Sequence, residues 1–148
     1  MFLTAVFSVL LGSAPLEPGR YCRSEQIFGE TGKNERFALG EFWMVVDVQR
    51  RGREIYVEFE NEMPDSGQRL RSQGQARPRP NGTVRFKFTD TWGNQGVATL
   101  SRLGVITLTP VVPAADVLSK NVLRNYGTYR LTKKACAISG LTKFRRLR

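Results

Sequence analysis

The stretch Gly82-Thr-Val-Arg-Phe-Lys-Phe-Thr-Asp-Thr-Trp-Gly-Asn-Gln-Gly-Val-Ala-Thr-Leu-Ser-Arg-Leu-Gly-Val-Ile-Thr-Leu108 decides the fold class of this chain. Its first part alternates apolar with polar residues, so that Val84, Phe86 and Phe88 share one face of a strand. The run 92–96 (Trp-Gly-Asn-Gln-Gly) is rich in residues that tolerate a positive φ, and it predicts a reversal of the chain. Two further short apolar runs follow and meet at Gly104. The stretch therefore predicts an antiparallel meander.

A second hairpin is predicted in the first half of the chain. Residues 41–49 predict a strand. One face carries Phe42, Met44, Val46 and Val48, and the other carries Trp43, Val45, Asp47 and Gln49. The run 50–53 (Arg-Arg-Gly-Arg) is a charged turn, and residues 54–63 return with apolar residues inward at Ile55, Val57 and Phe59.

Two polar stretches interrupt the strand pattern. Residues 29–35 are expected to form a loop, because they combine glycine with charged side chains. Residues 68–75 can hold a short strand, but the prolines of the run 77–80 (Arg-Pro-Arg-Pro) argue against a central strand there.

Short strands separated by turns, together with 14 glycines, favour an all-β fold. We predict a small antiparallel barrel of seven to eight strands, with a β-sandwich as the alternative. Residues 113–123 are compatible with a short helix before the last strand, which we place at 126–133.

The first fourteen residues differ from the rest of the chain. Residues 1–11 are uncharged and mostly apolar, and the small residues at 12–14 are of the kind that precede a signal-peptidase cut. We predict an export signal over 1–14, a single barrel domain over 15–140 and a basic tail over 141–148. The alternatives are a buried first strand or, least favoured, a membrane anchor, because a span needs about 18 apolar residues or more. The predicted localisation is periplasmic or extracellular.

Two cysteines, Cys22 and Cys136, lie near the two ends of the predicted domain. In an exported protein they are expected to form one disulfide, whereas in the cytosol they would be two buried thiols. Closing a loop of about 100 residues stabilises a fold by about 4–5 kcal/mol in the chain-entropy model. Such a link joins the first strand to the last and favours the barrel over the sandwich.

The net charge of +10 is distributed unevenly. Residues 1–66 carry 7 basic and 11 acidic side chains, a net of −4, whereas residues 67–148 carry 16 basic and 2 acidic side chains, a net of +14. An anionic polymer or lipid head groups are therefore the expected partners of the second part. Nucleic acid is disfavoured because export removes the protein from it. The candidate contacts are Arg77, Arg79, Lys143, Arg145, Arg146 and Arg148.

The absence of histidine excludes several kinds of catalyst. Ser–His and Cys–His couples and imidazole metal ligands cannot form, and two cysteines cannot make a four-thiolate zinc site. The remaining carboxylates on one strand alternate with apolar residues and are expected to face solvent rather than a substrate. We predict no enzymatic activity, no metal and no cofactor. These strand carboxylates are Glu54, Glu58, Glu60 and Glu62.

Asp90 is the one carboxylate that shares a face with the apolar residues of its strand. It either caps the 92–96 turn through backbone N–H groups or contacts a partner. Trp92 and Asn94, in the turn itself, are the other candidate partner contacts.

These observations favour an exported, non-catalytic binding protein. We expect it to occupy a partner protein of the cell envelope, as an inhibitor or immunity-type protein does, or to hold a ligand inside the barrel. The alternative is binding to an anionic polymer or membrane surface through the basic half. A carboxylate-based hydrolase ranks third.

Overall fold

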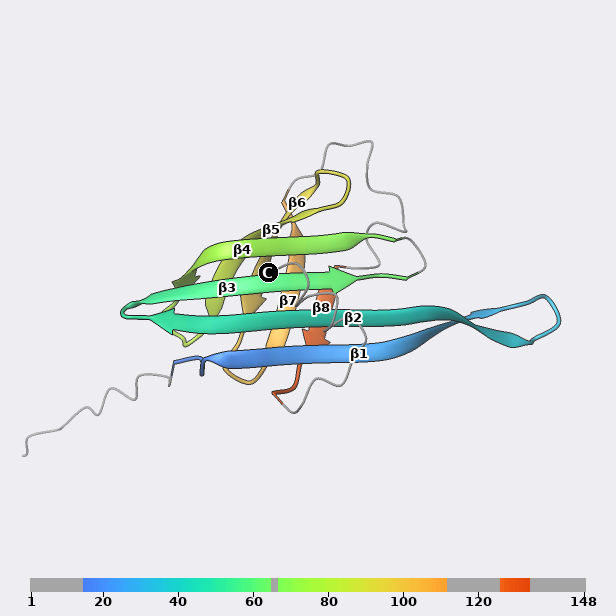
Figure 1. The fold of residues 1–148 in the computed structure, drawn as a ribbon, viewed down its shortest axis with the longest axis horizontal. Coiled ribbons are helices and arrows are strands. Elements are labelled where there is room, and N and C mark those ends of the chain that lie inside the picture. Colours follow the sequence, from blue (N-terminus) through green and yellow to red (C-terminus); the bar gives the residue numbers. More distant parts are fainter. Residues whose placement is uncertain (1–14, 65–66, 112–125, 134–148) are drawn as a thin grey trace, which may run out of the picture.

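The computed structural model describes residues 15–64, 67–111 and 126–133. Eight strands follow one another in a single antiparallel sheet whose spatial order is the order of the sequence (Figure 1). No helix occurs among the described residues. The strands are β1 (Gly19–Glu30), β2 (Arg36–Arg51), β3 (Glu54–Glu62), β4 (Arg69–Pro78), β5 (Val84–Asp90), β6 (Gln95–Leu100), β7 (Val105–Pro110) and β8 (Gly127–Arg130).

The sheet curls until its first and last strands meet. Just beyond β8, Thr132 pairs with Cys22 of β1, and each backbone N–H donates to the other residue's carbonyl at 2.9 Å. Leu131, the residue between β8 and Thr132, is buried. Its N–H donates to the carbonyl of Gly104 in the β6–β7 turn at 2.8 Å. The result is a nearly closed barrel, which confirms the predicted fold class and excludes the sandwich.

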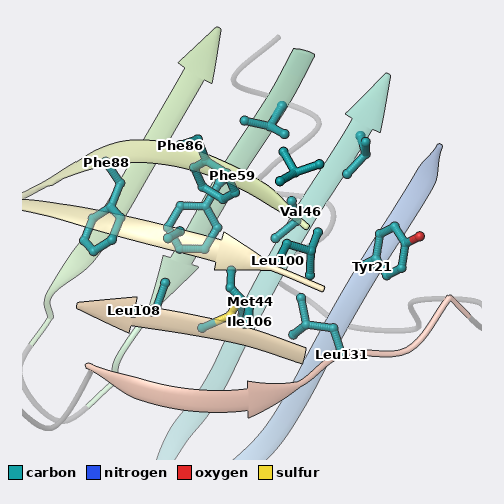
Figure 2. Packing of buried hydrophobic residues seen from close by; sticks show 14 of the residues in the cluster. Tyr21, Met44, Val46, Phe59, Phe86, Phe88, Leu100, Ile106, Leu108 and Leu131 are labelled. Atoms are coloured by element: carbon teal, nitrogen blue, oxygen red, sulfur yellow. The ribbon is translucent and has the colours of Figure 1, made fainter. Parts of the chain in front are cut away.

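Apolar side chains from all around the sheet fill the barrel interior (Figure 2). The alternation predicted for β5 is present, since Val84, Phe86 and Phe88 are each at most 4% exposed. Ring contacts cross the interior: the Phe59 centroid lies 5.5 Å from that of Phe86 and 5.7 Å from that of Phe88, and Phe42 stacks on Tyr129 at 5.4 Å. These rings occupy space that a ligand inside the barrel would need.

The segment before β1 closes one end of the barrel. Leu16 is 2% exposed and belongs to the core cluster, and the hydroxyl of Tyr21 donates to the Glu17 carbonyl at 2.6 Å. The ammonium of Lys133 donates to the Glu17 carboxylate at 2.9 Å, and this hydrogen bond lowers the pKa of Glu17 from its ordinary value. The start of the described chain is thus tied to the residues that follow β8.

Several strand boundaries differ from the predicted ones. β1 extends to Glu30, into the predicted loop, and β2 begins at Arg36, ahead of the predicted start at 41, so the loop between them shrinks to residues 31–35. β4 continues to Pro78, which is tolerated because it is the last residue of the strand. The predicted helix at 113–123, the export signal and the basic tail at 141–148 lie outside the described residues.

The outward face of β2 and β3 is more buried than the sequence predicts. Trp43 and Val45 are on that face, yet they are 1% and 0% exposed. Glu60 was expected to face solvent, but it is 3% exposed and accepts hydrogen bonds from the guanidinium of Arg71 at 3.1 and 3.2 Å. A carboxylate loses its water when it is buried, and pairing with a charged donor offsets that cost.

Candidate functional site

A meander places alternate turns at alternate ends, so the barrel has two distinct ends. One end, which we call the arm end, carries the β1–β2, β3–β4 and β5–β6 turns. The other, which we call the arginine end, carries the β2–β3, β4–β5 and β6–β7 turns together with the N-terminus of β1.

The β1–β2 hairpin projects beyond the arm end (Figure 1). β1 pairs with β2 as far as Glu30 and Arg36, whereas β3 pairs with β2 only from Trp43 onward. Residues 36–42 of β2 therefore have β1 as their only strand neighbour among the described residues. We call the two-stranded ribbon of residues 26–41, with its turn, the arm. A bulge between Ile27 and Phe28 shifts the register within it, and bulges increase the local twist.

Large apolar side chains of the arm face solvent. Phe28 and Phe37 are each 47% exposed, and Leu39 is 41% exposed. The ring of Phe37 lies over Gly29, and the guanidinium carbon of Arg36 lies 4.7 Å from the Phe28 ring centroid. These contacts order the side chains without burying them, so the arm presents apolar surface on a narrow projection.

Sequence reasoning did not select these three residues. It assigned residues 29–35 to a loop and gave no element to the apolar residues on either side of it. The available signal was the pair of short apolar runs, 27–28 and 37–39, on the two sides of a polar turn.

The structure places Asp90 in a turn-capping role. One carboxylate oxygen accepts from the backbone N–H groups of Trp92 at 2.9 Å and Asn94 at 2.7 Å, and the other accepts from the side-chain amides of Asn94 at 2.8 Å and Gln68 at 3.0 Å. Asp90 itself is 9% exposed. Of the three predicted partner contacts, Asp90 and Asn94 therefore serve the β5–β6 turn.

Trp92 is the residue of that group that remains accessible. It is 50% exposed in the β5–β6 turn and lies at the same end of the barrel as the arm. A half-exposed tryptophan offers the kind of aromatic surface that is enriched at protein interfaces.

The predicted basic residues fall into two groups. Arg77 and Arg79 lie at the arginine end, where Arg77 is directly opposite Arg85 of β5. Lys143, Arg145, Arg146 and Arg148 lie outside the described residues, and so does Cys136. Cys22 itself is 5% exposed, and its Sγ lies 3.7 Å from the Thr132 carbonyl oxygen.

Carboxylates of β3 accept hydrogen bonds from neighbouring side chains of the sheet. Glu62 accepts from the Trp43 indole at 3.0 Å and from Arg69 at 3.1 Å, and Glu54 accepts from the Tyr56 hydroxyl at 3.3 Å. Within residues 15–64, 67–111 and 126–133, no three His, Cys, Asp or Glu side chains are grouped so that they could hold a metal ion. The same residues contain no helix of the length and hydrophobicity needed to cross a membrane.

Comparison with models of known protein families, with curated proteins and with solved structures finds no match to this chain.

Proposed function

We propose that this protein is an exported, non-catalytic binding protein that occupies a partner protein of the cell envelope through the arm end of its barrel. The observation that carries the proposal is the arm itself, a projecting ribbon whose three large apolar side chains are 41–47% exposed. A hydrophobic projection is costly in water unless a partner covers it, and narrow projections fit the concave surfaces at which enzymes bind their substrates.

Three further observations support this proposal over a ligand held inside the barrel. Aromatic contacts cross the interior, where Phe42 stacks on Tyr129 and Phe59 contacts Phe86. Trp92 adds a second exposed aromatic side chain at the arm end. Phe28, Phe37 and Leu39 do not belong to the core cluster, so they are available for binding without being needed for folding.

The proposal is tested with the triple variant Phe28→Ser/Phe37→Ser/Leu39→Ser. The immobilised protein is exposed to an envelope extract, the retained partner is purified, and its affinity is measured for each variant. The arm variant should bind at least tenfold more weakly, because truncated apolar anchors at the centre of an interface each cost about 1–2 kcal/mol or more.

Leu103→Ser is the matched control, because Leu103 is 71% exposed in the β6–β7 turn at the opposite end. It should leave the affinity unchanged, and both variants should keep the melting temperature of the parent protein. A partner that binds the arm variant as tightly as the parent would refute the proposed site.

A further inference from the structure

The arginine end concentrates positive charge that the described residues do not neutralise. Residues 50–54 and 77–85 come together there through the β2–β3 and β4–β5 turns, and they contain six arginines and a single carboxylate. That carboxylate, Glu54, accepts a hydrogen bond from Tyr56. The six arginines are Arg50, Arg51, Arg53, Arg77, Arg79 and Arg85.

Four other arginines of the sheet are neutralised by carboxylates. Arg20, Arg23, Arg69 and Arg71 each pair with a carboxylate at 2.7–3.1 Å. None of the six at the arginine end forms an ion pair with a carboxylate in the described part of the chain. Arg77 and Arg85 even stand directly opposite each other on β4 and β5. Like charges in that position destabilise a sheet, and an anion bound nearby would offset that cost.

A pocket of about 140 Å³ opens at the arginine end. Arg50, Arg53 and Arg79 line it, and they come from the end of β2, the β2–β3 turn and the β4–β5 turn. Its apolar wall includes Leu16 and Val84, which belong to the barrel core. Three cations therefore border a pocket whose base is fixed by the core.

The backbone that carries Arg79 is held in place. The Arg79 N–H donates to the Thr83 carbonyl at 2.8 Å, and the Gly82 N–H donates to the Arg79 carbonyl at 3.0 Å. Pro78 and Pro80 flank Arg79 and restrict its backbone further. A guanidinium on a rigid turn loses less freedom when it binds an anion, so the site is partly preorganised.

From this geometry we propose that the arginine end is a binding site for a phosphate group, held in the pocket by Arg50, Arg53 and Arg79. Guanidinium groups match the oxygens of phosphate in planar, bidentate hydrogen bonds. Of the described residues, three arginines line the pocket and no carboxylate does, so nothing in this wall competes with an anion for them. A pocket of this size accommodates the group with part of its hydration. The site is separate from the arm and does not depend on the function proposed for it.

The test compares two variants with the same change in net charge. Arg50→Gln/Arg53→Gln/Arg79→Gln removes the pocket cations, and Lys33→Gln/Lys87→Gln/Arg130→Gln removes three exposed cations outside the pocket. Binding of inorganic phosphate is measured by calorimetry at constant ionic strength. Binding of phosphatidylglycerol vesicles, against phosphatidylcholine vesicles, is measured by sedimentation.

We expect the pocket variant to lose at least fivefold in affinity and the outside variant to stay within twofold of the parent. Pocket-dependent binding of inorganic phosphate would identify a free or polymer-borne phosphate as ligand. Pocket-dependent binding of the anionic vesicles alone would identify a lipid head group.

Arg79→Lys keeps the charge and should still lose part of the affinity, since an ammonium cannot form the bidentate contact. Equal losses in the pocket and outside variants would overturn the site, because net charge would then explain them. No measurable binding of either probe by the parent protein would overturn it as well. The arm variant should bind both probes like the parent.

Discussion

Asp90 and Glu60 show how a single carboxylate takes its role from its neighbours. The alternation of strand residues correctly placed Asp90 on the inward face of β5. Its four hydrogen bonds with Trp92, Asn94 and Gln68 show that it caps a turn. The same alternation placed Glu60 on the outward face, but the prediction that Glu60 is exposed to solvent was wrong. The β3–β4 register sets Arg71 directly opposite Glu60, and Arg71 supplies the hydrogen bonds that the buried carboxylate needs.

Tyr126 carries a prediction at this scale. Its hydroxyl is buried and has no hydrogen-bond partner among the described residues, so Tyr126→Phe should keep or raise the free energy of unfolding at pH 7, by up to about 1 kcal/mol. Burial, and secondarily the negative charge of Asp90, raise the pKa of Tyr126 above 10.0. The folded state therefore keeps a proton that the unfolded chain releases, and stability is lost as pH rises through and beyond about 10.

The variant removes that contribution and should lose less stability than the parent between pH 9 and pH 11 in urea unfolding. Some loss persists, because burial also raises the pKa of Tyr21 and Tyr129. Tyr21→Phe is the contrasting variant: it removes the hydrogen bond to the Glu17 carbonyl and should be destabilised by about 1 kcal/mol at pH 7. A clear destabilisation by Tyr126→Phe at pH 7 would contradict the prediction.

At the scale of elements, turn chemistry and strand alternation explain the meander. β5 and β6 pair from Val84–Leu100 to Thr89–Gln95, and three glycines fall where the chain reverses, namely Gly52, Gly93 and Gly104. Gly96, which the sequence placed in the 92–96 turn, lies in β6. The pairing of β6 also brings Gly96 opposite Phe88, whose ring lies over the glycine. Because Gly96 has no side chain, the Phe88 ring can lie over it and contact Phe59 and Tyr126 in the interior.

Gly96→Ala should therefore destabilise the barrel although its backbone conformation suits alanine. The new Cβ would overlap the Phe88 ring, with further ring atoms at 2.6 and 2.8 Å, and Phe88 is only 2% exposed. Overpacking of this kind costs about 1–3 kcal/mol, which denaturant unfolding would detect. Gly32→Ala is the control, since nothing lies within 4 Å of its new Cβ. Equal stability of the two variants would show that the Phe88 ring can move away freely.

At the scale of the whole molecule, the residues just after β8 lie beside β1. Thr132 and Cys22 form two backbone hydrogen bonds with each other, each N–H donating to the other residue's carbonyl. Cys136 follows only four residues after Thr132 in the sequence. This proximity supports the predicted Cys22–Cys136 disulfide, which stays a prediction because Cys136 lies outside the described residues.

Thiol titration of native, unreduced protein should accordingly find no free thiol. Cys22→Ser/Cys136→Ser should still fold, because the core does not depend on the link, but it should lose a few kcal/mol of stability, up to the 4–5 kcal/mol that loop closure predicts. Two titratable thiols in the native protein would contradict the pairing. In that case the double variant should be nearly as stable as the parent.

The sequence by itself determined the fold class, the order of the hairpins, the inward residues of β3 and β5 and the uneven charge. These features follow from local rules, because a strand's period and a turn's residue preferences act over a few neighbouring positions. Only the tertiary structure decided that β1 and β2 extend beyond β3 to form an arm. It also decided that Trp43 and Glu60 are buried on the outer face. Finally, it brought Arg50 and Arg53 beside Arg79 around one pocket. Each of these depends on register and closure, which bring together residues distant in the chain, and the alternation of a single strand carries no information on its partners' length or position.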